Sequence, residues 1–310
     1  MLRLILLAIA GTAVIFSGSD NTLDFTVNPD GSGKAVVETI LPPMPPEAVS
    51  NMGADDVLAA QVAKQMLRMT PDVEVWADVT VGKTEDGRIR FKGTAYFKDI
   101  ATVDLGPSKD DAVTWAKDPQ GGMLLAVETK GRKPQPPAVA AEPPKLSDEE
   151  IAKQIDAARQ RFKKMATNMG QMKTELIYRL PGTVSDVAGF TKADDGSLHW
   201  SLDGVKALQA AEKAMADDAF LRECILAGKN PMLTVLEKDF LPTLKARASG
   251  DLKPLFDYAA EVKAAKDALP KMLEKLGLGK KPEKAETPAA PEKPTTPAET
   301  PKAAPVEAPK

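Results

Sequence analysis

Few side chains in this sequence are of the types that perform catalysis or hold a metal. The 310 residues include one histidine, His199, and one cysteine, Cys224. A single cysteine excludes an intrachain disulfide, a CxxC redox pair and a thiolate zinc cluster. His199 alternates with apolar neighbours, as in a strand, and Cys224 follows apolar residues at helical spacing. We expect a partly covered strand histidine and a buried thiol rather than a general base and a nucleophile.

Acidic residues are more numerous but form no recognisable site. The pairs Asp55-Asp56, Asp110-Asp111 and Asp217-Asp218 each precede an apolar run, so helix capping explains them. The segments Asn28–Gly33 and Asp194–Gly196 resemble the start of calcium loops but lack the bidentate acid at the end. No phosphate-binding, nucleophile-elbow or metalloprotease motif occurs. We therefore predict no enzyme activity, no cofactor and no metal.

The N-terminus has the pattern of an export signal. Arg3 precedes an apolar run from Leu4 to Phe16, which as a helix spans about 20 Å. The hydrocarbon core of a bilayer is about 30 Å thick, so the run is short for a membrane span and suits a signal peptide. Ser17 and Ser19 supply the small side chains that signal peptidase requires, and cleavage is expected before Asp20. The alternative is a retained segment that tethers the chain as a short N-terminal anchor.

The composition limits which partners are expected and indicates where the folded part of the chain ends. The sequence is 43% hydrophobic with a net charge of −3, which permits a core and gives no electrostatic basis for nucleic-acid binding. Residues 280–310 are almost wholly Pro, Ala, Lys, Glu and Thr, so we expect a disordered tail. Residues 131–146 are also rich in proline and are predicted to be a linker or insertion.

Paired β-prone runs indicate hairpins. Asp24–Val27 and Lys34–Leu41 flank the turn Asn28–Gly31, and a third hairpin is expected within 112–129. The clearest hairpin joins 73–81 to 89–97 through a three-residue loop. That register pairs Val81 with Phe91 and Trp76 with Tyr96 across the strands. These two aromatic residues are expected to lie under a helix, and the alternative is a ligand platform.

Two helices are expected to pack against this sheet. The first covers about 54–69 and the second about 148–169, where Ser147 and Glu150 form a capping box. Apolar residues of the second helix recur at a spacing of three and four. Its second half is basic, with Arg159, Arg161, Lys163 and Lys164. This basic surface is expected to be solvated, and contact with anionic lipid is the alternative.

The remaining segments complete an α+β fold built mainly from antiparallel hairpins with packed helices. A strand over 172–180 should be followed by a hairpin of 184–190 with 198–202. The predicted order is a signal or anchor (1–19), a hairpin and helix part (20–130), the linker (131–146), a helix with strands (147–204), a helical region (205–279) and the tail (280–310).

The order of hairpins resembles a known family. The segments Tyr178–Val184 and Asp194–Trp200 contain a strand ending in Leu-Pro-Gly, an Asp-Gly turn and a strand with tryptophan. With the early hairpins, this pattern is similar to the LppM-like domain of bacterial exported lipoproteins over about residues 23–202. The resemblance implies a bacterial protein associated with the membrane, with no established reaction. The segment Phe16–Ser19 is similar to a lipobox, but Ser19 stands where the lipid-accepting cysteine would be.

These observations lead to a functional hypothesis and two alternatives. We expect a non-catalytic exported protein of the bacterial cell envelope, outside the cytoplasmic membrane, with an interaction or scaffold role. One alternative is a carrier of lipid or another apolar ligand, held between the sheet and its helices. The other is a hydrolase whose acidic site cannot be identified. The expected partners are envelope components or lipid, and not nucleic acid.

Overall fold

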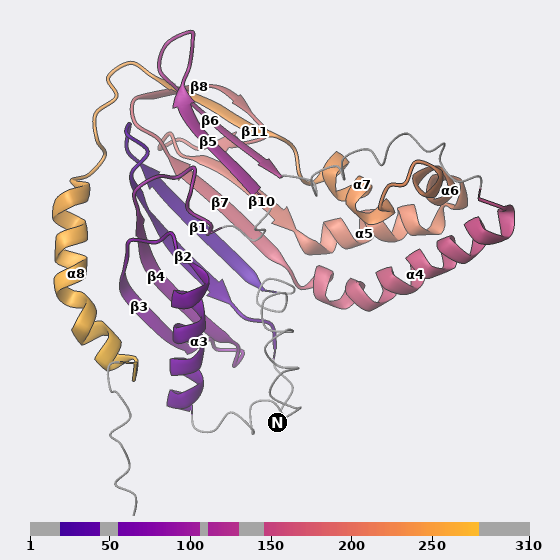
Figure 1. The fold of residues 1–310 in the computed structure, drawn as a ribbon, viewed down its shortest axis with the longest axis horizontal. Helices are drawn as coiled ribbons and strands as arrows, with labels where there is room; N and C mark the ends of the chain where they lie inside the picture. Colours follow the sequence, from indigo (N-terminus) through magenta and orange to yellow (C-terminus); the bar gives the residue numbers. More distant parts are fainter. Residues whose placement is uncertain (1–18, 44–54, 106–110, 130–145, 279–310) are drawn as a thin grey trace, which may run out of the picture. The chain divides into compact units, whose positions relative to one another are not determined.

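The computed structural model describes residues 19–43, 55–105, 111–129 and 146–278 and has the predicted α+β fold (Figure 1). The strands form a seven-stranded sheet in the order β3-β4-β2-β1-β7-β10-β9 and a four-stranded sheet in the order β5-β6-β11-β8. The predicted signal peptide apart from Ser19, the linker apart from Leu146, and the tail lie outside the described residues.

The strand bounds are as follows. The larger sheet contains β1 (Asp20–Val27), β2 (Gly33–Ile40), β3 (Val75–Lys83), β4 (Ile89–Phe97), β7 (Lys173–Arg179), β9 (Thr191–Lys192) and β10 (Leu198–Asp203). The smaller sheet contains β5 (Asp111–Lys117), β6 (Met123–Thr129), β8 (Thr183–Ala188) and β11 (Leu244–Ser249). The pairs β1–β2, β3–β4 and β5–β6 confirm the three predicted hairpins. The strands β1 and β7 are paired in parallel.

The register of the β3–β4 hairpin is as predicted only near its loop. Val81 is opposite Phe91, and the Thr84 N–H donates to the Arg88 carbonyl at 2.8 Å. Further along, the register shifts between Ala77 and Thr80. Asp78 has a φ of +52° at this point. The shift is a β-bulge, which places one additional residue in β3.

The bulge makes the predicted Trp76–Tyr96 pair wrong. Trp76 lies opposite Ala95, and it is Val75 that lies opposite Tyr96. Because a shift by one residue exchanges the two faces of a strand, Trp76 enters the core and packs edge-on against Phe91, with a centroid distance of 5.5 Å. Tyr96 lies on the other face, among residues of a helix, as predicted.

Two further predictions about strands are corrected. Strand β8 does not form a hairpin with β10, because it pairs with β11 of the smaller sheet. The partner of β10 on that side is the two-residue strand β9. The region 205–279, predicted to be helical, contains β11 between β6 and β8.

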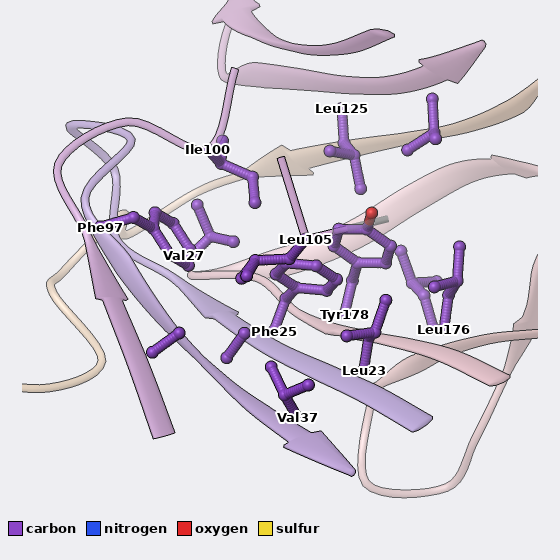
Figure 2. Packing of buried hydrophobic residues seen from close by; sticks show 14 of the residues in the cluster. Leu23, Phe25, Val27, Val37, Phe97, Ile100, Leu105, Leu125, Leu176 and Tyr178 are labelled. Atoms are coloured by element: carbon purple, nitrogen blue, oxygen red, sulfur yellow. The ribbon is translucent and has the colours of Figure 1, made fainter. Parts of the chain in front are cut away.

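The main core lies between the two sheets. The Phe25 and Tyr178 rings are stacked with centroids 4.8 Å apart, and Phe190 meets Tyr178 edge-on. Figure 2 shows Leu125, from the smaller sheet, approaching Tyr178 of the larger sheet. The helix α3 (Asp55–Met69) adds Leu58 and neighbouring apolar residues to this cluster, as its sequence predicts.

The second predicted helix packs mainly against other helices rather than against the sheet. It is α4 (Asp148–Gly170), which packs against α5 (Gly204–Ala216) and α6 (Asp218–Leu226), and α5 also contacts α7 (Pro231–Asp239). These four helices, here called the helical layer, have their own apolar cluster, which includes Phe162, Ala211 and Leu221. The physical reason is that the apolar seam of α4 finds apolar faces on α5 and α6. Trp200 contacts both this cluster and the main core.

The last helix, α8 (Tyr258–Lys275), lies against β3. Its first part packs on Val75 and Tyr96, whereas Met272 near its end contacts the main core. In Figure 1 it is well separated from the helical layer. Of the helices in the described ranges, none combines the length and apolar character needed to cross a membrane.

Candidate functional site

The helical layer contains a groove of about 440 Å³. Residues of α4, α5, α6 and α7 line it together with the loop between α6 and α7. Its apolar floor includes Phe162, Met165, Met215 and Met232. The volume lies within the range of about 300–1,000 Å³ that is typical of small-ligand sites.

Local sequence signals place the helices that line the groove. Ser147 and Glu150 form the predicted capping box at the start of α4. The carboxylates of Asp203 and Asp217 accept the first free N–H groups of α5 and α6, and Asn230 does the same for α7 before Pro231. Four well-defined helix starts therefore fix where the apolar faces meet.

Ion pairs hold α4 against α6. Arg159 donates to the carbonyl of Met215 at 2.9 Å and to Asp218 at 2.6 Å. Arg222 donates to Asp148 at 2.7 Å. These contacts connect both ends of the α4–α6 interface, so two of the basic residues in the layer have structural partners.

Two other cations at the groove have no such partner. Arg161 of α4 and Lys229 of the α6–α7 loop line it, and in the described parts of the chain neither side chain makes an ion pair or hydrogen bond. No acidic side chain is among the described residues that line the groove. Met165, on the same face of α4, is 45% exposed although its position in the seam predicts burial. The groove therefore combines apolar side chains, of which Met165 is exposed, with unneutralised positive charge.

His199 lies in an arrangement that resembles a catalytic triad. Its Nε2 is 2.8 Å from the Ser197 hydroxyl, and its Nδ1 is 3.4 Å from the Glu175 carboxylate. However, the Ser197 hydroxyl and N–H both donate to Asp195, and Ser197 is only 2% exposed. A nucleophilic serine must donate its proton to the histidine and must reach a substrate. These contacts instead stabilise the turn that precedes β10.

The acidic segments considered for metals or catalysis have structural partners. Asp30 accepts the Ser32 N–H at 3.0 Å and the Ser32 hydroxyl at 2.6 Å. The Ser197 hydroxyl and the Arg179 guanidinium hold the pKa of Asp195 below its usual value. Within the described ranges, no three His, Cys, Asp or Glu side chains are grouped so that they could hold a metal ion.

The paired aspartates have different environments. Asp217 caps α6, as predicted. Asp111 is instead the first residue of strand β5, so its expected capping role was wrong. Asp55 begins α3, but its side chain and Asp110 lie outside the description. The pairs are not assembled into a common site in the described parts of the chain.

The remaining predicted residues are also placed. Cys224 is a buried thiol at 4% exposure, and the His199 side chain is partly covered at 35%. Ser17 lies outside the described residues. Ser19 is fully buried, and its hydroxyl accepts from the Asn21 side chain at 2.9 Å. Asp20 begins β1 and pairs with Arg88 at 2.9 Å. Cleavage between Ser19 and Asp20 would therefore have to take place before the chain folds.

The helix α8 is held to the larger sheet by two carboxylates, each bound by a lysine and a tyrosine. Glu74 accepts from Lys266 at 2.6 Å and from the Tyr258 hydroxyl at 2.8 Å. Glu261 accepts from Lys34 at 2.7 Å and from the Tyr96 hydroxyl at 2.9 Å. The Lys266 and Tyr258 hydrogen bonds lower the pKa of Glu74, whereas burial and the carboxylates raise the pKa of both tyrosines.

These pKa shifts predict how acid affects the α8 contact. A carboxylate whose folded pKa is below its usual 4.5 stabilises the fold above that value and loses this contribution as pH falls through the folded pKa. We expect Glu74→Gln to lower the urea midpoint at about pH 7, and the difference from wild type to diminish as the pH falls below 4.5 and through the folded pKa. The exposed Glu128→Gln is the control and should not change the midpoint. A pH-independent loss in Glu74→Gln would contradict the assignment.

No protein-family profile, curated protein or solved structure matches this chain. The groove was not predicted from the sequence, although three of its parts were noted. The spacing of Phe162 and Met165, the basic residues near Arg161 and the Asn230-Pro231 helix start all belong to it. The carrier hypothesis placed a ligand between the sheet and its helices. The described groove lies instead among helices, while apolar side chains pack between the sheets.

Proposed function

We propose that this chain is a non-catalytic binding protein of the bacterial cell envelope and that the groove in the helical layer holds its ligand. The observation that carries the proposal is the groove itself, about 440 Å³ with a methionine-rich floor and an unpaired cationic rim. Methionine side chains are flexible and polarisable, so such a floor adapts to apolar ligands of different shapes. The groove favours ligand binding over a purely scaffolding role.

The location in the envelope rests on the sequence. The apolar run from Leu4 to Phe16 after Arg3, followed by Ser17 and Ser19, supports export by a signal peptide. The resemblance to the LppM-like domain supports the same compartment. A protein outside the cytoplasmic membrane with an apolar groove would bind lipid-derived or other apolar molecules of the envelope.

A binding role also accounts for the polar clusters. The Ser197 hydroxyl is held by Asp195, and Glu74 and Glu261 attach α8. Each of these groups has a structural partner, whereas Arg161 and Lys229 at the groove have none in the described residues.

The experiment that tests this proposal fills the groove. Ala158 lies in the groove, so Ala158→Trp should occupy its floor. We expect the neutral fluorescent probe N-phenylnaphthylamine to bind the wild-type protein and to bind Ala158→Trp about tenfold more weakly or not at all. Ala152 is exposed on the same helix and does not line the groove, so Ala152→Trp is the matched control and should bind as wild type.

Two outcomes would contradict the proposal. One is the absence of probe binding to the wild-type protein, provided that its circular dichroism shows a folded chain. The other is equal binding by Ala158→Trp and wild type, which would place the apolar site elsewhere. A cooperative unfolding transition in both tryptophan variants excludes misfolding as the cause of lost binding.

A further inference from the structure

The charge distribution at the groove indicates one class of ligand. Arg161 and Lys229 approach it from different elements, α4 and the α6–α7 loop. No carboxylate of the described residues lines the groove or neutralises either cation. A neutral apolar ligand would leave both charges without a partner, whereas an anionic head group would form charge-assisted hydrogen bonds with them.

The apolar floor accounts for the other part of such a ligand. On α4, Ala158, Arg161 and Met165 follow one another at intervals of three and four residues, so they lie along one face of the helix. Met215 and Met232 add apolar surface from α5 and α7. One cation of α4 thus lies between two apolar side chains of the same stripe. A ligand with an apolar chain next to its charged group fits this pattern.

The size of the groove favours a small amphiphile over a macromolecule. A volume of about 440 Å³ suits a small molecule, whereas a stable protein partner needs a contact area of about 800 Å² on each side. The neighbouring basic residues Arg159 and Arg222 are already paired with acids within the layer. Of the cations that line the groove, Arg161 and Lys229 therefore remain available to a ligand.

Resting on the proposed function, we propose that the groove binds a free single-chain anionic amphiphile, such as a long-chain carboxylate. Arg161 and Lys229 bind its carboxylate, and the chain lies on the methionines of the floor. Each methylene group of the ligand chain that becomes buried on the floor should raise the affinity about fourfold at most. The ionic contact weakens as salt rises, because both cations are near the surface.

The test measures competition against N-phenylnaphthylamine bound to the full chain. Dodecanoate should displace the probe at a concentration about tenfold lower than dodecyltrimethylammonium, which has the same chain and the opposite charge. The double variant Arg161→Gln/Lys229→Gln should lose this preference, with displacement by each amphiphile measured against the variant's own probe affinity. Lys163 is exposed on α4 outside the groove, so Lys163→Gln is the control and should keep the preference.

The outcomes separate this inference from the proposed function. Equal displacement by the two amphiphiles, or a preference that persists in the double variant, would overturn the anionic ligand but leave an apolar groove. Failure of the wild type to bind the probe would overturn both proposals. Co-sedimentation with phosphatidylglycerol vesicles, combined with no competition by dodecanoate, would show a membrane-docking surface and would also overturn the inference.

Discussion

Replacing Tyr178 with alanine is expected to lower the free energy of unfolding by about 4 kcal/mol, which is most of the stability of a domain at the lower end of the usual range. Tyr178 is 2% exposed at the centre of the larger sheet. Its ring stacks on Phe25 at an interplanar angle of 11° and meets Phe190 edge-on. The substitution removes both ring contacts and leaves a cavity between the sheets, which the surrounding strands can fill only in part.

Urea denaturation followed by circular dichroism measures this loss. Leu255 is 45% exposed, so Leu255→Ala removes a large apolar side chain without creating a buried cavity and should change stability by less than about 0.5 kcal/mol. A loss of under about 1 kcal/mol in Tyr178→Ala would mean that the two sheets do not close over this ring. The slope of the unfolding free energy against urea concentration should be unchanged if the variant exposes the same surface area on unfolding as the wild type.

The first hairpin shows which features the sequence predicts well. Apolar side chains alternate along β1, and Asn28, Asp30 and Gly31 supply the turn between the strands. Gly31 has a φ of +88°, which glycine adopts at no steric cost. Asn28 also anchors the segment before α8, because its side chain accepts the Leu255 N–H at 2.9 Å. The hairpin could be predicted because its signals are local, whereas that last contact is remote in sequence.

The bulge in β3 shows why a register can be wrong in half of a strand. Val73 to Val81 alternate without interruption, so the sequence predicts one apolar face. The structure divides that set, because Asp78 adopts a left-handed conformation and the strand continues with the opposite phase. Asp tolerates this conformation better than most residues, but nothing in the local pattern requires it there. The register of this half of the strand is instead set by the burial of Trp76 in the main core.

Strand β11 illustrates a long-range pairing that overrides local propensity. Leu244, Ala246 and Ala248 alternate with polar residues, yet the neighbouring sequence and the alanines favour a helix. The strand forms because β6 and β8 present free edges on both sides. Arg247 then joins its neighbours by contacting Asp118 at 2.7 Å and Asp186 at 3.0 Å. None of these partners is near β11 in the sequence.

The groove required the same kind of long-range information. The apolar spacing of α4 was visible, and we expected its seam to face the sheet. The structure buries Phe162 in the apolar cluster of the helical layer and leaves Met165 exposed. The sequence does not indicate that the α6–α7 loop brings Lys229 to the same place as Arg161. A candidate site therefore emerged only when four separate helices were placed together.

The position of α5 against α4 should depend strongly on Gly204, the first residue of α5. Its N–H donates to the Met172 carbonyl at 2.8 Å. A Cβ atom added at this position would clash with the backbone oxygens of Met169 and Met172, at the end of α4 and the approach to β7. Backbone atoms cannot rotate away as a flexible side chain can. We expect Gly204→Ala to destabilise the protein by about 3 kcal/mol, the upper part of the range for overpacking.

The same substitution should also weaken binding at the groove. Met215 of α5 forms part of the floor, so a shift of α5 away from α4 would change the shape of the site. We expect N-phenylnaphthylamine to bind Gly204→Ala about tenfold more weakly under conditions in which the larger sheet is still folded. Gly82 has open space around its Cβ position and a φ outside the left-handed region, so Gly82→Ala is the matched control. Alanine at this position reduces only the conformational freedom of the unfolded chain. This control should therefore keep full binding, and its free energy of unfolding should rise by up to about 1 kcal/mol. Equal behaviour of the two variants would show that α5 is not held against α4 through this close approach.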